Sequence, residues 1–377
     1  MPASSHAVRC GLAAFGLTQL LGCAATRSDV PARTRTYYIA ADTVEWDYVP
    51  GGKDEITGKP FADTVFFKAG KTQPISTKYL KTLYREYTDS TFKALKPRPP
   101  EWEHLGFLGP VIRGVVGDTI RVVFRNNGSH PYSMHPHGVF YNKDSEGAPY
   151  EDGTQGTDKS DDGVPPGGTH VYTWPVPERA GPGPMDPSSV IWMYHSHTDE
   201  IADVNAGLFG PMIITARGKA RDDGSPVDVD RELVTAYMQT HEENSWHAAT
   251  NIKISPAQQA NIIPSPRIPQ QIYPPFVTFS INGFMHGTLP LRSMTIKKGQ
   301  RVRWYLLAST NDFDAHSPHW HGNTVLLNQM RTDVAELNPM GMLIADMVPD
   351  NVGTWLYHCH ISFHLASGMQ ARYAVTP

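Results

Sequence analysis

Near its C-terminus the chain carries a cysteine among residues that bind soft metal ions. Cys359 has a histidine on each side, and His364 and Met369 follow it. A thiolate, two imidazoles and a weakly bound thioether form the ligand set of a blue electron-transfer copper, which alternates between Cu(I) and Cu(II). Cys359, His364 and Met369 would supply three of those four ligands, so this segment predicts a copper site.

The two histidines beside the cysteine are predicted to serve a different metal. In an extended strand, residues i and i+2 share one face, and residue i+1 points to the other. His358 and His360 therefore face away from the copper that Cys359 binds. They are free to hold a second copper centre.

Histidines gather in four short clusters along the chain. The clusters are His135-Pro-His137, His195-Ser-His197, His316-Ser-Pro-His319-Trp-His321, and His358-Cys-His360 with His364. One isolated His-x-His pair is compatible with two strand histidines and no metal. Four clusters, which hold ten of the chain's 17 histidines, indicate several metal ions instead.

An internal repeat relates these clusters to one another. Val116–Phe124 precedes His135-Pro-His137 as Lys298–Tyr305 precedes His319-Trp-His321, and Trp192-Met-Tyr-His195-Ser-His197 matches Trp355-Leu-Tyr-His358-Cys-His360. We infer one fold used twice.

The alignment of the two halves predicts where the blue copper lies. The second half has His316, Cys359, His364 and Met369 where the first has Tyr132, Ser196 and residues near Ile201 and Leu208. We therefore expect the electron-accepting copper in the second half alone. Eight imidazoles remain after His316 and His364 are assigned to it, and eight suit three further coppers.

Alternation of apolar and polar residues indicates the elements that must position these ligands. It predicts strands at Thr119–Phe124, His170–Trp174, Val277–Ile281 and Arg301–Leu306, and a short helix near Thr77–Tyr87. The charged stretch Arg217–Val227, with Gly and Pro, is typical of a link between domains. We expect an all-β protein of two sandwich domains, residues 36–218 and 228–377.

The N-terminal segment predicts a location outside the cytoplasm. Residues 1–30 have the charge, short apolar run and small residues of an export signal. Within them Leu20–Cys23 resembles a bacterial lipobox, in which Cys23 would carry a lipid anchor; ordinary cleavage near residue 24 or 25 is the competing expectation. Of three cysteines only Cys359 lies beyond this segment, so we expect no intrachain disulfide. The net charge of −4 offers no basic patch for nucleic acid.

These motifs resemble those of the multicopper oxidases of the two-domain kind, similar to bacterial small laccases. The resemblance covers both halves and implies two cupredoxin-like Greek-key β-sandwich domains. Tyr37–Tyr48, His135–Tyr141 and Gly181–Pro187 are more similar to ceruloplasmin and the related clotting-cofactor domains. That second likeness bears on ancestry more than on substrate.

The resemblance implies four coppers per chain. It makes His316, Cys359, His364 and Met369 the type 1 ligands, His135 and His319 the type 2 ligands, and His137, His195, His197, His321, His358 and His360 the ligands of the type 3 pair. A reducing substrate would give single electrons to the type 1 copper, and the cluster of three would reduce O2 to water.

Reduction of O2 consumes protons, so an acidic group near the cluster is expected to act as a relay. Glu146 is the first candidate, and Asp199 or Glu200 the next. Tyr141 could sit near the type 2 copper as a spare electron donor. For all of them a solvated loop carboxylate or a packed tyrosine is the alternative.

The acidic segment around Glu146 also suggests a calcium loop. Asp161 and Asp162 resemble such a loop of the ceruloplasmin domains, and hard oxygen ligands suit Ca²⁺. The alternative, a solvated loop without a metal, is the one we favour from the sequence.

The split of ligands between two halves predicts an assembly. In small laccases, which the chain resembles, the facing halves come from different subunits and three chains close a ring. A closed head-to-tail ring is the expected form of such a contact. We therefore expect a homotrimer with copper clusters between subunits.

The substrate is the least determined feature. We rank oxidation of phenols and aromatic amines first and oxidation of Fe(II) or Cu(I) second. Asp312 and Asp314 could serve Fe(II), and Met340, Met342 and Met347 could serve Cu(I). A copper nitrite reductase and a non-catalytic binding module are the remote alternatives, and a copper count of four, two, or fewer would separate the three.

Overall fold

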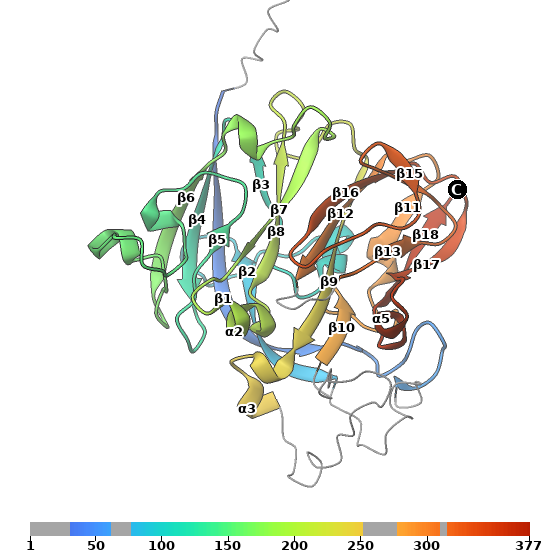
Figure 1. Cartoon of the computed structure of the whole chain (residues 1–377), viewed down its shortest axis with the longest axis horizontal. Helices are drawn as coiled ribbons and strands as arrows, with labels where there is room; N and C mark the ends of the chain where they lie inside the picture. Colours follow the sequence, from blue (N-terminus) through green and yellow to red (C-terminus); the bar gives the residue numbers. More distant parts are fainter. Residues whose placement is uncertain (1–30, 62–76, 252–276, 310–314) are drawn as a thin grey trace, which may run out of the picture.

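The structure is a computed structural model that describes residues 31–61, 77–251, 277–309 and 315–377. The predicted export signal with Cys23, and the candidate iron ligands Asp312 and Asp314, lie outside the described residues. Four sheets follow one another from left to right in Figure 1, two from the first half of the chain and two from the second.

The first half forms two four-stranded sheets. One has the order β2 (Lys78–Tyr87), β1 (Thr34–Asp47), β4 (Thr119–Asn126) and β6 (Thr169–Pro175). The other has the order β3 (Ile112–Val115), β8 (Phe209–Thr215), β7 (Ser189–His195) and β5 (His135–Pro136). Strand β4 alternates buried and half-buried residues, as a strand between core and solvent should. The two sheets pack over a shared apolar core.

The second half repeats this arrangement. One sheet has the order β10 (Val277–Ile281), β9 (Arg231–His241), β12 (Val302–Ser309), β16 (Met342–Met347), β14 (Val325–Leu327) and β15 (Met330–Thr332). The other has the order β11 (Thr295–Lys297), β18 (Gln370–Thr376), β17 (Gly353–Cys359) and β13 (Pro318–Trp320). Strand β9 runs parallel to β12 as β1 runs parallel to β4. The all-β prediction of two Greek-key sandwiches is confirmed.

Helices in the described residues are short. The α-helices are α2 (Glu200–Ala206), α3 (Ala248–Asn251) and α5 (Ser362–Ala366). The 3₁₀ turns are η2 (Pro100–Leu105), η3 (Lys143–Ser145), η4 (Gly156–Lys159), η5 (Glu178–Ala180), η6 (Glu242–Asn244) and η7 (Leu291–Met294). Helices α2 and α5 occupy equivalent places, directly after β7 and β17.

One predicted element is wrong. The segment read as a short helix near Thr77–Tyr87 is strand β2, paired antiparallel with β1 from Tyr38 opposite Tyr87 to Asp47 opposite Lys78. Its tyrosines and threonine favour strands, and the long partner strand supplies hydrogen bonds for the whole segment. Tertiary pairing therefore overrides the local helical pattern.

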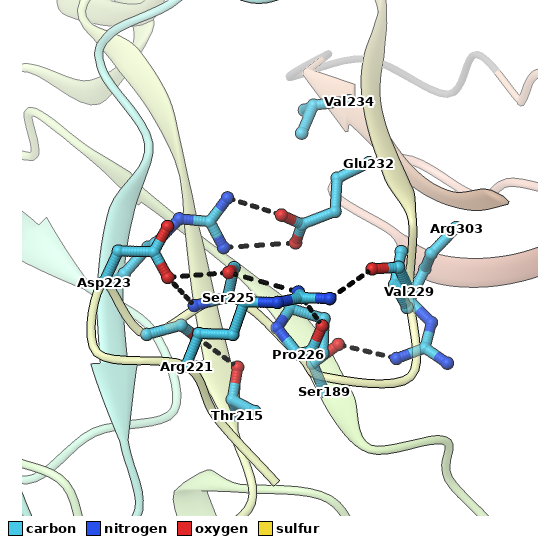
Figure 2. A network of polar contacts seen from close by, with 12 residues as sticks. Ser189, Thr215, Arg221, Asp223, Ser225, Pro226, Val229, Glu232, Val234 and Arg303 are labelled. Atoms are coloured by element: carbon cyan, nitrogen blue, oxygen red, sulfur yellow. Dashed lines mark hydrogen bonds and ion pairs between the residues drawn. The ribbon is translucent and has the colours of Figure 1, made fainter. Parts of the chain in front are cut away.

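The halves meet through a buried, mixed interface. A third apolar core joins β7 and β8 of the first half to β9 and β12 of the second. Beside it, the Arg113 guanidinium donates two hydrogen bonds to the Glu232 carboxylate, at 2.6 and 3.1 Å. Figure 2 shows Arg303 donating to Ser189, and Arg221 of the linking segment donating to the carbonyl of Val229. These contacts hold the two sandwiches against each other.

Candidate metal centre

The end of β17 and the start of α5 create a buried cluster of soft ligands. Cys359 ends β17, His364 lies on α5, and His316 precedes β13, and their ligand atoms all lie within 4.8 Å of one another. Cys359, His316 and His364 are 0%, 1% and 2% exposed. The backbone N–H of Ser317 donates to the Cys359 Sγ at 3.3 Å. A thiolate and two imidazoles in a dry pocket fit copper.

Backbone hydrogen bonds bring the fourth expected ligand to the same place. Met369 is fully buried, and its carbonyl accepts from the Cys359 N–H at 3.1 Å. Its own N–H donates to the His364 carbonyl at 2.9 Å. The structure thus gathers all four residues that the sequence proposes for one site.

The histidines beside Cys359 form a second cluster on the opposite face of β17. Nε2 of His358 lies 3.0 Å from Nε2 of His321, and His319 completes a group whose ligand atoms lie within 4.8 Å. The exposed His360 has its ring centroid 5.1 Å from that of His319. Strand alternation thus separates the two clusters by a single residue, as expected.

The first half holds the matching four histidines. His135 on β5 stands opposite His195 on β7, and Nε2 of His137 lies 3.2 Å from Nε2 of His195. The ring of His197 lies 5.3 Å from that of His135. Each half therefore brings its two His-x-His pairs together.

Backbone carbonyls fix the orientation of one nitrogen in each half-site. Nδ1 of His135 lies 2.7 Å from the Glu146 carbonyl, and Nδ1 of His319 lies 2.8 Å from the Asp333 carbonyl. Because a carbonyl can only accept, each Nδ1 carries the proton, and Nε2 keeps its lone pair for a metal. Nδ1 of His195 and of His358 also face carbonyls, at 3.1 and 2.8 Å.

Burial favours the neutral form of several of these imidazoles. Burial and, to a lesser extent, neighbouring histidines together lower the pKa of His137 and of His358 to about 4. Burial also lowers the pKa of His195 well below its usual value, again with help from neighbouring histidines. Neutral imidazole is the form that binds metal ions, so the residues fit a copper cluster.

The two half-sites do not meet within one chain. In the described residues, the ring contacts of the eight histidines stay inside their own half. Figure 1 shows β5 left of centre and β7 near the middle of the molecule, and β13 and β17 at the right. The outer imidazoles are accessible: the His197 side chain is 38% exposed, and His360 is exposed.

The expected relay residues lie beside the first half-site. The Glu146 carboxylate accepts from the Lys143 ammonium at 2.6 Å and from the Tyr150 hydroxyl. The Tyr141 ring lies 5.8 Å from that of His135, and Tyr141, Glu146 and Tyr150 line a cavity of about 720 Å³. A Glu200 oxygen lies 3.5 Å from His197 Nε2. Asp199 instead caps α2 by accepting from the Ala202 N–H.

The residues expected to bind calcium have other partners. The buried Asp161 carboxylate accepts from the Gly147 N–H at 2.6 Å, and Asp162 lies 3.5 Å from the Lys159 ammonium. Neither belongs to the two groups of three metal-ligating side chains that the described part of the chain contains.

The structure corrects one step of the alignment between halves. Asp203, two residues after the expected position at Ile201, stands in the place of His364. The Leu208 N–H donates to the Asp203 carbonyl as the Met369 N–H donates to the His364 carbonyl. Helix α2 is longer than α5, which shifts the sequence register after the shared His-x-His pairs. The acidic residue was therefore missed, and the glycine that follows each helix is the signal that could have found it.

Family models and known proteins agree with this geometry. Two models, both described as multicopper oxidase, match residues 105–219 and 264–377. Ferroxidase HEPHL1 from Mus musculus is 41% identical over 351 residues, covering 92% of this chain and 30% of that protein. Ceruloplasmin from Homo sapiens is 36% identical over 381 residues, covering 98% of this chain and 35% of that protein.

Solved structures share the fold. A crystal structure of a multicopper oxidase has a TM-score of 0.55 at 18% identity, covering 91% of this chain and 89% of that one. A copper nitrite reductase from Nitrosomonas europaea has the same TM-score at 15% identity, with 91% and 94% covered. The chain spans about a third of the length of the curated relatives that it matches. On the family models and the two clusters of ligands together, the chain belongs to the multicopper oxidase family.

Proposed function

We propose that this chain takes electrons one at a time from a small reductant and uses them to reduce O2 to water. The observation that carries the proposal is the position of Cys359 in the buried soft-ligand site, with His358 and His360 as its covalent neighbours in a second site. Copper, when bound, supplies the one-electron redox chemistry and the binding of O2. The chain itself supplies a dry pocket, oriented imidazoles and a short covalent path between the two sites.

We assign the ligands as the family pattern implies. His316, Cys359, His364 and Met369 hold type 1 copper, His135 and His319 hold type 2, and His137, His195, His197, His321, His358 and His360 hold the type 3 pair. The domains are residues 36–218 and 228–377. The locked Nδ1 atoms and the neutral imidazoles support this assignment, which amounts to four coppers per chain.

We propose that the three-copper cluster forms between chains of a homotrimer. Each chain carries two accessible half-sites that stay apart, so a second copy is needed to complete either one. Its relatives are about three times as long, which means that three copies of this chain have about the length of one relative. In a head-to-tail ring, each half-site of one chain pairs with the complementary half-site of the next chain.

Fe(II) is the reductant we propose first. Two of the relatives, from Mus musculus and Homo sapiens, carry the name ferroxidase at 41% and 42% identity. This reverses the order expected from the sequence alone. The iron ligands suggested there, Asp312 and Asp314, lie outside the described residues.

Aromatic reductants are the second candidate, because aromatic side chains surround a ligand of the blue site. The His364 ring has the rings of Phe279 and Phe363 at centroid distances of 5.1 and 6.3 Å. Cu(I) has weaker support. Met347 packs in the core, and Met340 and Met342 line a cavity of about 1390 Å³ between the halves.

The remaining proposals concern proton delivery to the cluster and the export of the chain. Glu146 is the group we propose for proton delivery, since its carbonyl orients His135 and its carboxylate faces an open cavity. We also propose export by residues 1–30, with a lipid anchor at Cys23 or ordinary cleavage. In the described residues no helix is long and apolar enough to cross a membrane.

Oxygen uptake by the copper-loaded protein tests the proposal. Fe(II) and 2,6-dimethoxyphenol are compared at equal concentration, with correction for iron autoxidation. Faster uptake with Fe(II) supports a ferroxidase, and faster uptake with the phenol supports a laccase. No uptake with either reductant would contradict the oxidase; a copper content of two per chain would then favour a nitrite reductase, and a lower content a binding module.

A further inference from the structure

The first half contains a hydrogen-bonded centre where the second half has its blue-copper ligands. Asp203 replaces His364 and Ser196 replaces Cys359 in the structural register. Both are completely buried. The Ser196 hydroxyl donates to Asp203 Oδ2 at 2.6 Å, in the place where Cys359 Sγ lies 3.4 Å from His364 Nδ1.

The Asp203 carboxylate collects three donors in total. Besides the Ser196 hydroxyl, the Asp199 N–H donates to Oδ2 at 3.0 Å. The Trp246 indole N–H donates to Oδ1 at 2.8 Å. One of these donors, Ser196, lies between His195 and His197, and another, Asp199, lies two residues after His197, so the carboxylate fixes the chain on both sides of His197.

The same centre reaches the other histidine pair through Ser133. The Ser133 N–H donates to the Ser196 Oγ at 3.0 Å, and the His197 N–H donates to the Ser133 Oγ at 3.0 Å. The Ser133 hydroxyl in turn donates to the Gly147 carbonyl at 2.6 Å. Ser133 is two residues before His135, and Gly147 follows the residue whose carbonyl orients that histidine.

The second half has the backbone part of this arrangement without the carboxylate. There the Ser317 N–H donates to Cys359 Sγ, as the Ser133 N–H donates to Ser196 Oγ. In the second half the proposed blue-copper ligands come from both histidine segments and would link them through the metal. The first half lacks those ligands, so another contact must hold its two histidine segments together.

Trp246 closes this centre from the other half of the chain. It lies in the segment after β9 and packs against the core of the first half, with its ring stacked 4.0 Å from that of His130. A purely apolar residue would fill the space at Asp203 without the cost of burying a carboxylate. Three converging donors indicate a role in holding geometry.

We propose that Asp203 is a positioning residue that, through Ser196 and Ser133, holds His135, His137, His195 and His197 in the geometry of the copper cluster. The inference rests on the proposed function, since it assumes that these histidines bind copper. Asp203 does not touch the metal. Loss of the Asp203 carboxylate should weaken copper binding by the histidine cluster. The blue site, which lies in the second half, should be unchanged.

The test compares Asp203→Asn with Ser196→Ala and with a control, Asp118→Asn. Asp118 is also a buried carboxylate of the first half, but it directly precedes β4 and accepts from the Arg33 N–H and the Arg35 guanidinium. Each protein is titrated with copper, and the blue absorption and the type 2 electron paramagnetic resonance signal are measured separately. Thermal unfolding reports the stability of each variant.

Both Asp203→Asn and Ser196→Ala should lower the copper affinity of the cluster about 10–100-fold, because residues that orient metal ligands have effects of that size. Their blue absorption should equal that of the wild type. Asp118→Asn should keep both the blue absorption and the type 2 signal, even if it lowers the unfolding temperature as much as the other two variants do. If neither variant lowers the type 2 signal relative to the blue absorption, the inference is overturned. A wild-type protein without a type 2 signal would instead overturn the proposed function.

Discussion

At the scale of single residues, the chemistry depends on three consecutive side chains. Cys359 points into a buried site that contains no exposed ligand, and His358 and His360 point to the opposite face. Peptide bonds alone separate the two sites. Because neighbouring residues serve different sites, single substitutions should remove one centre and spare the other.

We predict that Cys359→Ser abolishes the blue absorption and oxygen uptake, because a hydroxyl is a poor ligand for a soft copper ion. The copper content should fall from four to three per chain, and the type 2 signal should remain. Ser317→Ala is the matched control, since it keeps the backbone N–H that donates to Cys359 Sγ. Persistent blue absorption in Cys359→Ser would show that another residue supplies the sulfur.

The sequence could predict which side chains gather into clusters, because strand alternation fixes which face each side chain takes. Cys359, His358 and His360 follow that rule directly. Asp203 was missed, because the longer α2 shifts the register, and only an alignment of the glycines after both helices reveals that shift. Nor could the sequence show that backbone carbonyls, such as those of Glu146 and Asp333, orient the imidazoles.

At the scale of elements, each half-site depends on a tryptophan packed against a glycine. Gly138 and Gly322 follow the second histidine of their pairs and have φ of +80° and +74°. A Cβ on Gly138 would come within 2.3 Å of the Trp192 ring, and one on Gly322 equally close to Trp355. These contacts seat the turn after β5 or β13 on the strand that carries the other histidine pair.

A left-handed conformation costs a residue other than glycine about 1–3 kcal/mol. We predict that Gly322→Ala lowers the free energy of unfolding by more than this. The additional loss comes from displacement of Trp355, and the cluster should lose copper with it. Gly299→Ala is the control for backbone strain alone, since Gly299 has φ of +80° and no atom within 4 Å of its Cβ position. If urea unfolding shows the same loss of unfolding free energy for Gly322→Ala and Gly299→Ala, displacement of Trp355 is not the cause.

Strand β2, misread as a helix from sequence, carries a lysine that joins the halves. The Lys81 ammonium lies 2.9 Å from the Glu242 carboxylate just after β9, and both side chains are fully buried. It also donates to the Asn205 carbonyl at 2.7 Å. The local pattern could not reveal this strand, because its partner groups lie far away in the chain.

Lys81→Met should therefore lower the free energy of unfolding by about 3–5 kcal/mol, because it leaves the Glu242 carboxylate buried without its partner. Lys96→Met, which breaks the exposed pair with Glu86, should change it by less than about 1 kcal/mol. Chemical unfolding measures both. Similar small effects would show that the buried pair does not join the halves.

At the scale of the whole molecule, the two sandwiches pack against each other, and each carries its own cluster of histidines. The shared apolar core and the buried Arg113–Glu232 pair hold the halves together. The repeat in the sequence predicted two copies of one fold, but not these contacts, because they join residues distant in the chain. We propose that the chain completes its copper clusters with other copies of itself.

Complementation between two inactive variants tests the central claim most directly. One variant has His135→Ala with His197→Ala, and the other has His319→Ala with His360→Ala. They are produced together with different tags, and mixed assemblies are isolated through both tags. Oxygen uptake is then measured for each variant alone and for the mixture.

We predict that each variant alone is inactive, while mixed rings of three recover roughly one third of the wild-type rate, since one interface in three then joins two intact half-sites. Type 2 copper should return to the same extent. A mixture as inactive as its components would contradict a cluster shared between chains and place both halves of the site within one chain.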